Sequence, residues 1–72
     1  MLSKTLLGDL RVIAQSFAGK GEVHLSDGRV AFLARGEDGE AECRAYMEQL
    51  PETSVPLSGV CEVIPGVYGV VR

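Results

Sequence analysis

The sequence contains few of the residues that bind metals. Its 72 residues include one histidine and two cysteines. These three residues, His24, Cys43 and Cys61, are far apart in the chain and show none of the spacings of a zinc site. The two cysteines could form one disulfide, but buried free thiols are the usual state in a reducing cytoplasm. We therefore expect no metal, no cofactor and two free thiols.

Long hydrophobic runs are missing as well. The longest, Val30 to Ala34, is far shorter than the roughly 20 apolar residues of a membrane-spanning helix. Asp9 and Arg11 interrupt the N-terminal segment before the apolar core of a signal peptide could form. We therefore expect a cytoplasmic protein that does not enter membranes.

Positive charge is scarce, since seven basic residues stand against ten acidic ones and the net charge is −3. Between residues 37 and 52, six carboxylates accompany Arg44 alone. This asymmetry argues against direct binding of nucleic acid. The carboxylates at the start of this segment suit the N-terminus of a helix. Alternatively, an acidic face led by Glu40, Glu42 and Glu48 could engage a basic surface on a nucleic-acid-handling partner, as a small inhibitor would.

The chain is long enough for one domain only, residues 1–72. A domain of this size buries about 60% of the surface that its unfolded chain exposes. Small domains therefore need a disulfide, a metal or oligomerisation for additional stability. Because this sequence favours neither of the first two, we expect self-association or docking on a partner protein.

The N-terminal segment has the apolar periodicity of a helix. Ser3 would cap this helix and Gly19 would end it. Its apolar residues recur at steps of three and four and form one stripe, which consists of Leu2, Leu6, Leu10, Ile13, Ala14 and Phe17.

A β-hairpin is predicted next, because residues 22–26 and 29–34 alternate around Asp27-Gly28, the favoured pair of a two-residue type I′ turn. This turn pairs Val23 with Phe32. The core face of the hairpin would then carry Val23, Leu25, Val30, Phe32 and Ala34. Leu33 and His24 would lie on the opposite, mostly polar face.

A second helix and a second hairpin complete the chain. Cys43, Tyr46, Met47 and Leu50 have helical spacing, and Pro51 ends this helix. Residues 57–64 and 67–72 then read as two strands that turn at Pro65-Gly66. This last hairpin is apolar on both faces.

The predicted fold class is α+β with the element order α-β-β-α-β-β. Two helices on one face of a four-stranded antiparallel sheet would bury both helical stripes. This arrangement is a ferredoxin-like sandwich whose first strand has moved to the end of the chain, where it becomes a central strand. The other face of the sheet would remain apolar and uncovered, and its predicted interface residues are Leu33, Val60, Ile64, Val67 and Val71.

The chain resembles acylphosphatases over two segments. Residues 21–50, which begin Gly-Glu-Val-His-Leu-Ser-Asp-Gly, are similar to the hairpin and following helix of that family. Residues 67–72, Val-Tyr-Gly-Val-Val-Arg, resemble its first strand and phosphate loop. The resemblance implies a ferredoxin-like fold and a phosphate-binding role for Arg72. His24 stands where the family has the asparagine that positions the attacking water.

Two hypotheses follow for the function. The sequence has no catalytic signature, since His24 lacks the orienting partner of a catalytic triad. The first hypothesis is therefore a small non-enzymatic binding or regulatory module that forms a homodimer or docks on a partner protein through the uncovered sheet face. The alternative is an acylphosphatase-like hydrolase of small acyl phosphates that uses Arg72 and His24.

Overall fold

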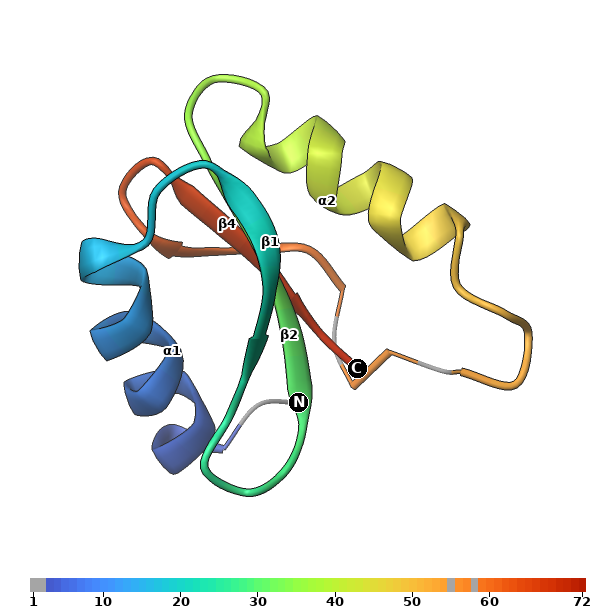
Figure 1. Cartoon of the computed structure of the whole chain (residues 1–72), viewed down its shortest axis with the longest axis horizontal. Coiled ribbons are helices and arrows are strands. Elements are labelled where there is room, and N and C mark those ends of the chain that lie inside the picture. The colour runs from blue at the N-terminus through green and yellow to red at the C-terminus, as the bar shows by residue number, and fades with distance from the viewer. Residues whose placement is uncertain (1–2, 55, 58) are drawn as a thin grey trace.

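The computed structural model describes all residues except 1, 2, 55 and 58. The elements follow in the predicted order, and their bounds are α1 Lys4–Ser16, β1 Lys20–His24, β2 Val30–Arg35, α2 Gly39–Glu48, β3 Cys61–Ile64 and β4 Val67–Val71 (Figure 1). The α+β class with two helices and a four-stranded antiparallel sheet is confirmed. Leu2, which the helical stripe included, lies outside the described residues.

Local chemistry explains the start of α1 and the turn of the second hairpin. The Ser3 hydroxyl accepts a hydrogen bond of 3.1 Å from the Leu6 amide, which makes Ser3 the N-cap of α1 as predicted. Gly66 has a φ of +85° in the Pro65-Gly66 turn. Such a positive φ is accessible to glycine at almost no cost, so the turn sequence dictates the second hairpin.

The strand order in the sheet is β1-β2-β4-β3, and all neighbours are antiparallel. The final strand, β4, is therefore central, as predicted. The edges are β1 and β3. The inner strands β2 and β4 carry apolar side chains on both faces, so both faces of the sheet need to be covered.

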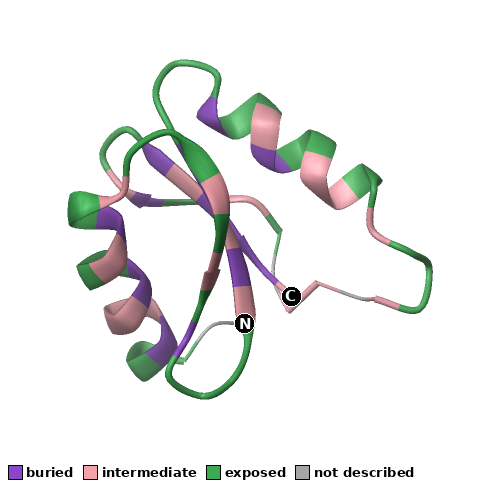
Figure 2. Ribbon diagram, viewed as in Figure 1, coloured by how far each residue is buried: buried purple, intermediate pink, exposed green. Residues whose placement is uncertain are grey.

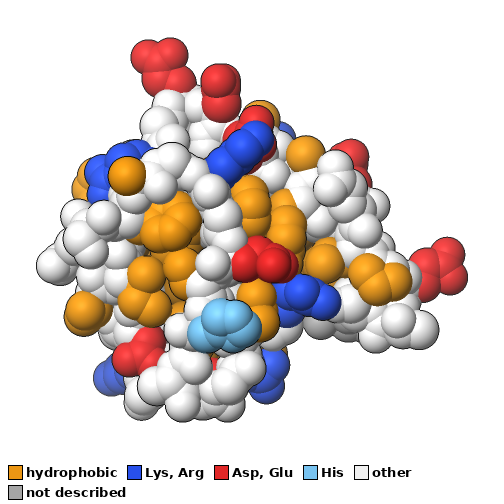
Figure 3. Space-filling model, viewed as in Figure 1, with side chains coloured by type: hydrophobic (Ala, Val, Ile, Leu, Met, Phe, Trp, Pro, Cys, Tyr) orange, Lys and Arg blue, Asp and Glu red, His pale blue; other side chains and the backbone are white. Residues whose placement is uncertain are grey.

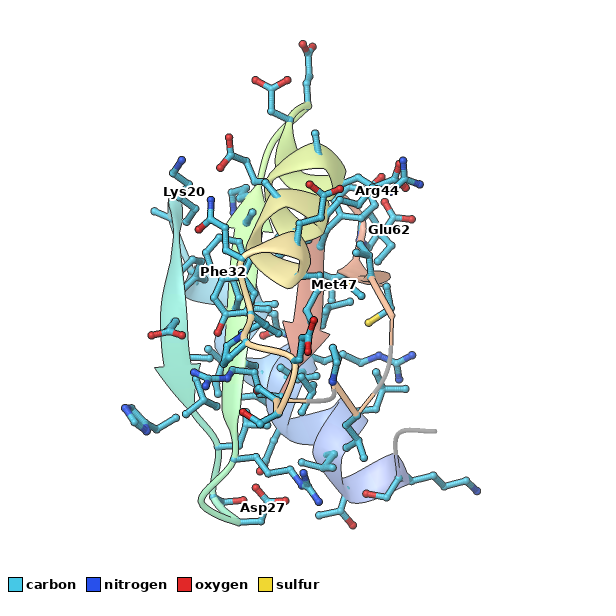
Figure 4. All side chains as sticks on the ribbon, turned by 90° about the vertical axis from the view of Figure 1, so that its right-hand side faces the viewer. Lys20, Asp27, Phe32, Arg44, Met47 and Glu62 are labelled. Atoms are coloured by element: carbon cyan, nitrogen blue, oxygen red, sulfur yellow. The ribbon has the colours of Figure 1, made fainter. Side chains whose placement is uncertain are left out.

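The two helices lie on opposite faces of the sheet, so the prediction that both cover one face is wrong. Ala31 and Leu33 of β2 pack in one cluster with Leu10 of α1, whereas the alternate residue Ala34 packs in a second cluster with Cys43 of α2. Figure 4 shows α2 in front of the sheet and α1 behind it. The physical reason is that β2 and β4 carry apolar side chains on both faces of the sheet. Each helix buries one of these two faces.

The first hairpin has a longer loop than predicted. Leu25 donates its amide hydrogen to the Arg29 carbonyl, and Gly28, with a φ of +90°, occupies the last position of a three-residue loop. Val23 consequently faces Ala31, not Phe32. This one-residue shift moves Val23 and Leu25 to the face of Leu33, which α1 covers.

The second hairpin contains a register shift. Ile64 faces Val67, as a two-residue Pro65-Gly66 turn requires, but Glu62 and not Val63 faces Tyr68, because the register shifts between Glu62 and Ile64. A shift of this kind is typical of a β-bulge, in which two residues of one strand oppose one residue of the other. Val63 is thereby buried in the cluster under α1.

The core consists of two thin layers on either side of the sheet. Leu10, Leu33, Val67 and Val71 are fully buried on the side of α1, and Cys43 and Val70 on the side of α2. Figure 2 shows the buried residues along the inner strands and on the sides of the helices that face them. Among the described residues, Val12 is the one large hydrophobic side chain that is mostly exposed.

Candidate functional site at the edge strand β1

The predicted apolar interface lies inside the protein. Leu33, Val67 and Val71 have no exposed surface, because α1 covers the sheet face on which they lie. Val60 and Ile64 are half-buried against the two core clusters. The prediction of an uncovered sheet face is therefore wrong, because α1 covers the apolar face that suggested it.

The predicted acidic face is partly neutralised within the protein. Glu40 pairs with Arg44 at 3.3 Å along α2. Glu42 accepts a hydrogen bond of 2.7 Å from the ammonium group of Lys20 on β1. Glu48 is exposed near the end of the helix. The three carboxylates thus have three different surroundings, and Glu42 ties α2 to the edge strand.

A groove runs between α2 and β1. Its volume is about 340 Å³, and its lining consists of Lys20, Gly21, Phe32, Glu42, Ala45, Tyr46 and Gln49. The rings of Phe32 and Tyr46 stack with 4.4 Å between their centroids and 11° between their planes. Figure 4 shows Lys20 and Phe32 on the β1 side of α2. The groove therefore combines an aromatic wall with charged groups at its rim.

A polar network of Glu22 and Arg72 lies beside the stacked ring of Tyr46. The Tyr46 hydroxyl donates to the Glu22 carboxylate at 2.5 Å, and the Arg72 guanidinium lies 3.4 Å from the same oxygen. Burial and the hydrogen bond to Glu22 raise the pKa of Tyr46. The phenol consequently stays protonated at neutral pH and remains a donor.

The outer side of β1 is a free sheet edge. No other strand among the described residues pairs with it. Leu25 donates to Arg29 and Arg35 donates to Gly19 at the two ends of the hairpin, so the β1–β2 hydrogen bonds fall on the odd-numbered residues of β1. By the alternation of an antiparallel ladder, the N–H and C=O groups of Lys20, Glu22 and His24 point away from β2.

Half-buried hydrophobic side chains flank β1 on both faces of the sheet. Phe17 lies on the side of α1, where its ring is 3.7 Å from the position that a Cβ of Gly21 would take. Phe32 and Tyr46 lie on the side of α2. Figure 3 shows hydrophobic side chains on both sides of the band of backbone that β1 forms. An added strand would therefore meet apolar surface above and below the sheet.

The two residues of the hydrolase hypothesis come to the same region but without a phosphate loop. His24 faces Val30, and the Arg72 amide donates to the Val30 carbonyl from the other side. Residues 67–71, however, form the central strand β4, and the Arg72 guanidinium is paired with Glu22. Acyl phosphate hydrolysis thus stays a prediction of the resemblance alone.

The cysteines form no disulfide, as predicted. Cys43 is fully buried, whereas Cys61 is half-buried, so burial of both thiols is only partly confirmed. Burial, with smaller contributions from Cys61 and Glu42, raises the pKa of Cys43 to about 11. This thiol is therefore protonated and poorly reactive at neutral pH. In the described part of the chain, no three His, Cys, Asp or Glu residues are grouped as metal ligands would be.

The sequence held a signal for this site that the prediction did not use. The sequence indicated a polar face for Glu22, a linker for Lys20 and the core for Tyr46 and Phe32. Whether these residues come together depends on the face of the sheet on which α2 packs. The helical periodicity of the sequence does not indicate which face a helix covers. The signal was the charge of the β1 segment, since charged residues such as Lys20 and Glu22 are typical of a sheet edge.

None of the helices in the described part of the chain is long and apolar enough to cross a membrane. Comparisons with models of protein families, with curated proteins and with solved structures found no match to this chain.

Proposed function

We propose that this protein is a small non-enzymatic binding module that receives an extended segment of a partner protein as an additional strand on β1. In this mode of recognition, main-chain hydrogen bonds supply affinity and side-chain pockets supply specificity. The observation that carries the proposal is the regular, unpaired edge of β1 beside the groove under α2.

The two sheet edges differ in a way that favours β1. All five residues of β1 keep one register with β2. The other edge strand, β3, has four residues and an irregular register with β4 between Glu62 and Ile64. Bulges protect sheet edges from pairing, because they twist the strand and interrupt its row of donors and acceptors. An incoming strand would therefore find a continuous template at β1.

The surroundings of β1 also suit a bound segment. Successive side chains of an extended segment point to opposite faces of the sheet. Those on one face would contact Phe17, and those on the other would reach the groove beside Tyr46 and Phe32. An apolar or aromatic side chain fits this groove, because it can pack against the stacked rings while Lys20 and Gln49 remain at the rim.

A pair of variants at His24 tests the proposal. His24 is exposed, and no hydrogen bond or ion pair joins its side chain to another described residue. Its N–H points outward, so His24→Pro removes a donor from the free edge and leaves the β1–β2 ladder in place. His24→Ala removes the same side chain and keeps the donor. Peptides selected from a random display library should bind His24→Ala like the original protein and His24→Pro about tenfold more weakly or worse.

The binding measurement is titration of each variant by calorimetry, with circular dichroism to show that both variants are folded. Equal affinity of a selected peptide for the two folded variants would contradict strand addition at β1. A selection that enriches no peptide would contradict the proposed function itself.

A further inference from the structure

We propose that the strand which β1 receives in the isolated protein is β1 of a second copy, paired antiparallel about a two-fold axis at Gly21. This inference rests on the proposed function, because it uses the same edge. It goes further by naming the occupant, the register and the residues that select it.

Charge complementarity along β1 selects this register. With Gly21 at the axis, Lys20 lies directly opposite Glu22 of the second copy, and this pair occurs twice. With Glu22 at the axis, the two glutamates would oppose one another. Opposite charges facing each other across strands stabilise a sheet, and like charges destabilise it. The Lys20-Gly21-Glu22 segment is therefore complementary to itself in one register and repulsive in the next.

The backbone geometry agrees with the same register. Lys20 and Glu22 carry the N–H and C=O groups that point to the free edge, so they would form the hydrogen-bonded pairs between the two copies. Gly21 would form the non-hydrogen-bonded pair at the axis, where the two Cα atoms approach to about 4.5 Å. Because glycine has no side chain, Gly21 itself does not obstruct this approach.

Side chains on both faces would extend the contact. On the face of α1, the Phe17 ring lies beside Gly21 and hence beside the axis, so that the rings of the two copies meet there. On the face of α2, the side chain of Lys20 is 61% exposed and that of Glu22 49%. Both can therefore turn toward the second copy without disturbing the core, Lys20 away from Glu42 and Glu22 away from Tyr46 and Arg72.

Self-association on this edge would compete with the binding of a partner segment. The edge of one strand can pair with only one other strand at a time. A dimer of this kind covers the free edge until a better-fitting segment replaces the second copy. Self-association consequently protects the exposed backbone groups of β1 and sets the affinity that a partner must exceed.

Charge reversal at the two residues tests the register. Lys20→Glu and Glu22→Lys each turn both ion pairs into like-charge pairs, and each should weaken dimerisation about tenfold. The double variant Lys20→Glu/Glu22→Lys restores opposite charges between the copies and should recover the dimer. It does not restore the pairs with Glu42 and Arg72 inside one chain, so recovery reports the contact between copies alone.

The measurement is sedimentation equilibrium over a concentration series at low salt. A second readout uses the unsubstituted protein: in a mixture of isotope-labelled and unlabelled chains, the Gly21 Hα atoms of the two copies should give an intermolecular nuclear Overhauser effect. The Gly21 signal decides the register where a charge-reversed variant fails to fold.

The outcomes separate the two proposals. A dimer that ignores charge reversal and lacks the Gly21 signal would overturn the inference. A monomer at every concentration that still binds selected peptides through β1 would overturn the dimer and leave the proposed function intact. A monomer that also binds no peptide would contradict both.

Discussion

Gly69 shows how closely single residues are fitted in the sheet. It lies in β4, and a Cβ at this position would come within 2.8 Å of Cδ2 of Leu33 and 3.0 Å of Cγ2 of Val63. Both neighbours are buried under α1. The glycine therefore serves packing, and its place within a family-like Val-Tyr-Gly-Val-Val-Arg segment does not indicate a phosphate loop.

Gly69→Ala should lower the free energy of unfolding by about 1 to 3 kcal/mol, because the added methyl group overpacks a dense region. Gly8 provides a matched control, since it lies in α1 and a Cβ there meets nothing within 4 Å. Gly8→Ala should raise the free energy of unfolding by about 0.5 to 1 kcal/mol. Urea denaturation measures both, and a neutral or stabilising effect of Gly69→Ala would contradict the packing described here.

At the same scale, the sequence predicted caps and turn glycines well and registers poorly. Ser3 and Gly66 act through their nearest neighbours in the chain, so their roles can be read locally. The loop at Asp27-Gly28 has three residues and not two, because both lengths suit this sequence and the choice depends on packing of Val23 and Leu25 under α1. Where both faces of a strand are apolar, the sequence of the strand does not set its pairing register, and packing against the rest of the fold decides it.

Among the elements, the C-terminus of α1 is held by a residue of β2. The helix has no basic residue in its last turn. The Arg35 guanidinium donates to the carbonyl oxygens of Ala14 at 2.8 Å and Phe17 at 2.7 Å. Positive charge at a helix C-terminus interacts favourably with the macrodipole, and the carbonyls there need donors. Arg35 thus joins α1 to the sheet and aligns it over the face of Leu33.

Arg35→Ala should lower the free energy of unfolding by about 1 to 2 kcal/mol, since several charge-assisted hydrogen bonds are lost at an exposed site. Arg11 is the control, because it is an exposed arginine of α1 without an ion pair among the described residues. Arg11→Ala should change the stability by less than about 0.5 kcal/mol. Equal effects of the two substitutions in urea denaturation would show that Arg35 does not hold the helix.

Element types and order could be predicted from the sequence, but the side of the sheet on which each helix packs could not. The stripe of α1 and the stripe of α2 each specify one buried face of a helix. Neither specifies which face of the sheet it covers. The alternation of polar and apolar residues would have decided the side of each helix if β2 or β4 had one polar face. Both faces are apolar, however, with Ala31 on the side of α1 and Phe32 on the side of α2.

The described part of the chain is a sheet enclosed between two helices, and the contact surface that we propose lies at its edge strand β1. The sequence predicted a binding function from an apolar excess, and the structure uses this excess for its own core. The proposed surface is the backbone of β1 with Phe17 on one side and the groove of Phe32 and Tyr46 on the other (Figure 3). Binding at such an edge would use backbone N–H and C=O groups, which the hydropathy pattern of a sequence does not reveal.

Amide hydrogen exchange of β1, resolved residue by residue by NMR, tests strand addition most directly. In dilute protein, the outward-pointing amides of Lys20, Glu22 and His24 should exchange fast, whereas Gly21 and Val23 should be protected by β2. A saturating selected peptide should slow the first three amides by about tenfold or more and leave the other two protected. Unchanged exchange at all three outward amides, or protection confined to α2 or β3, would contradict the account.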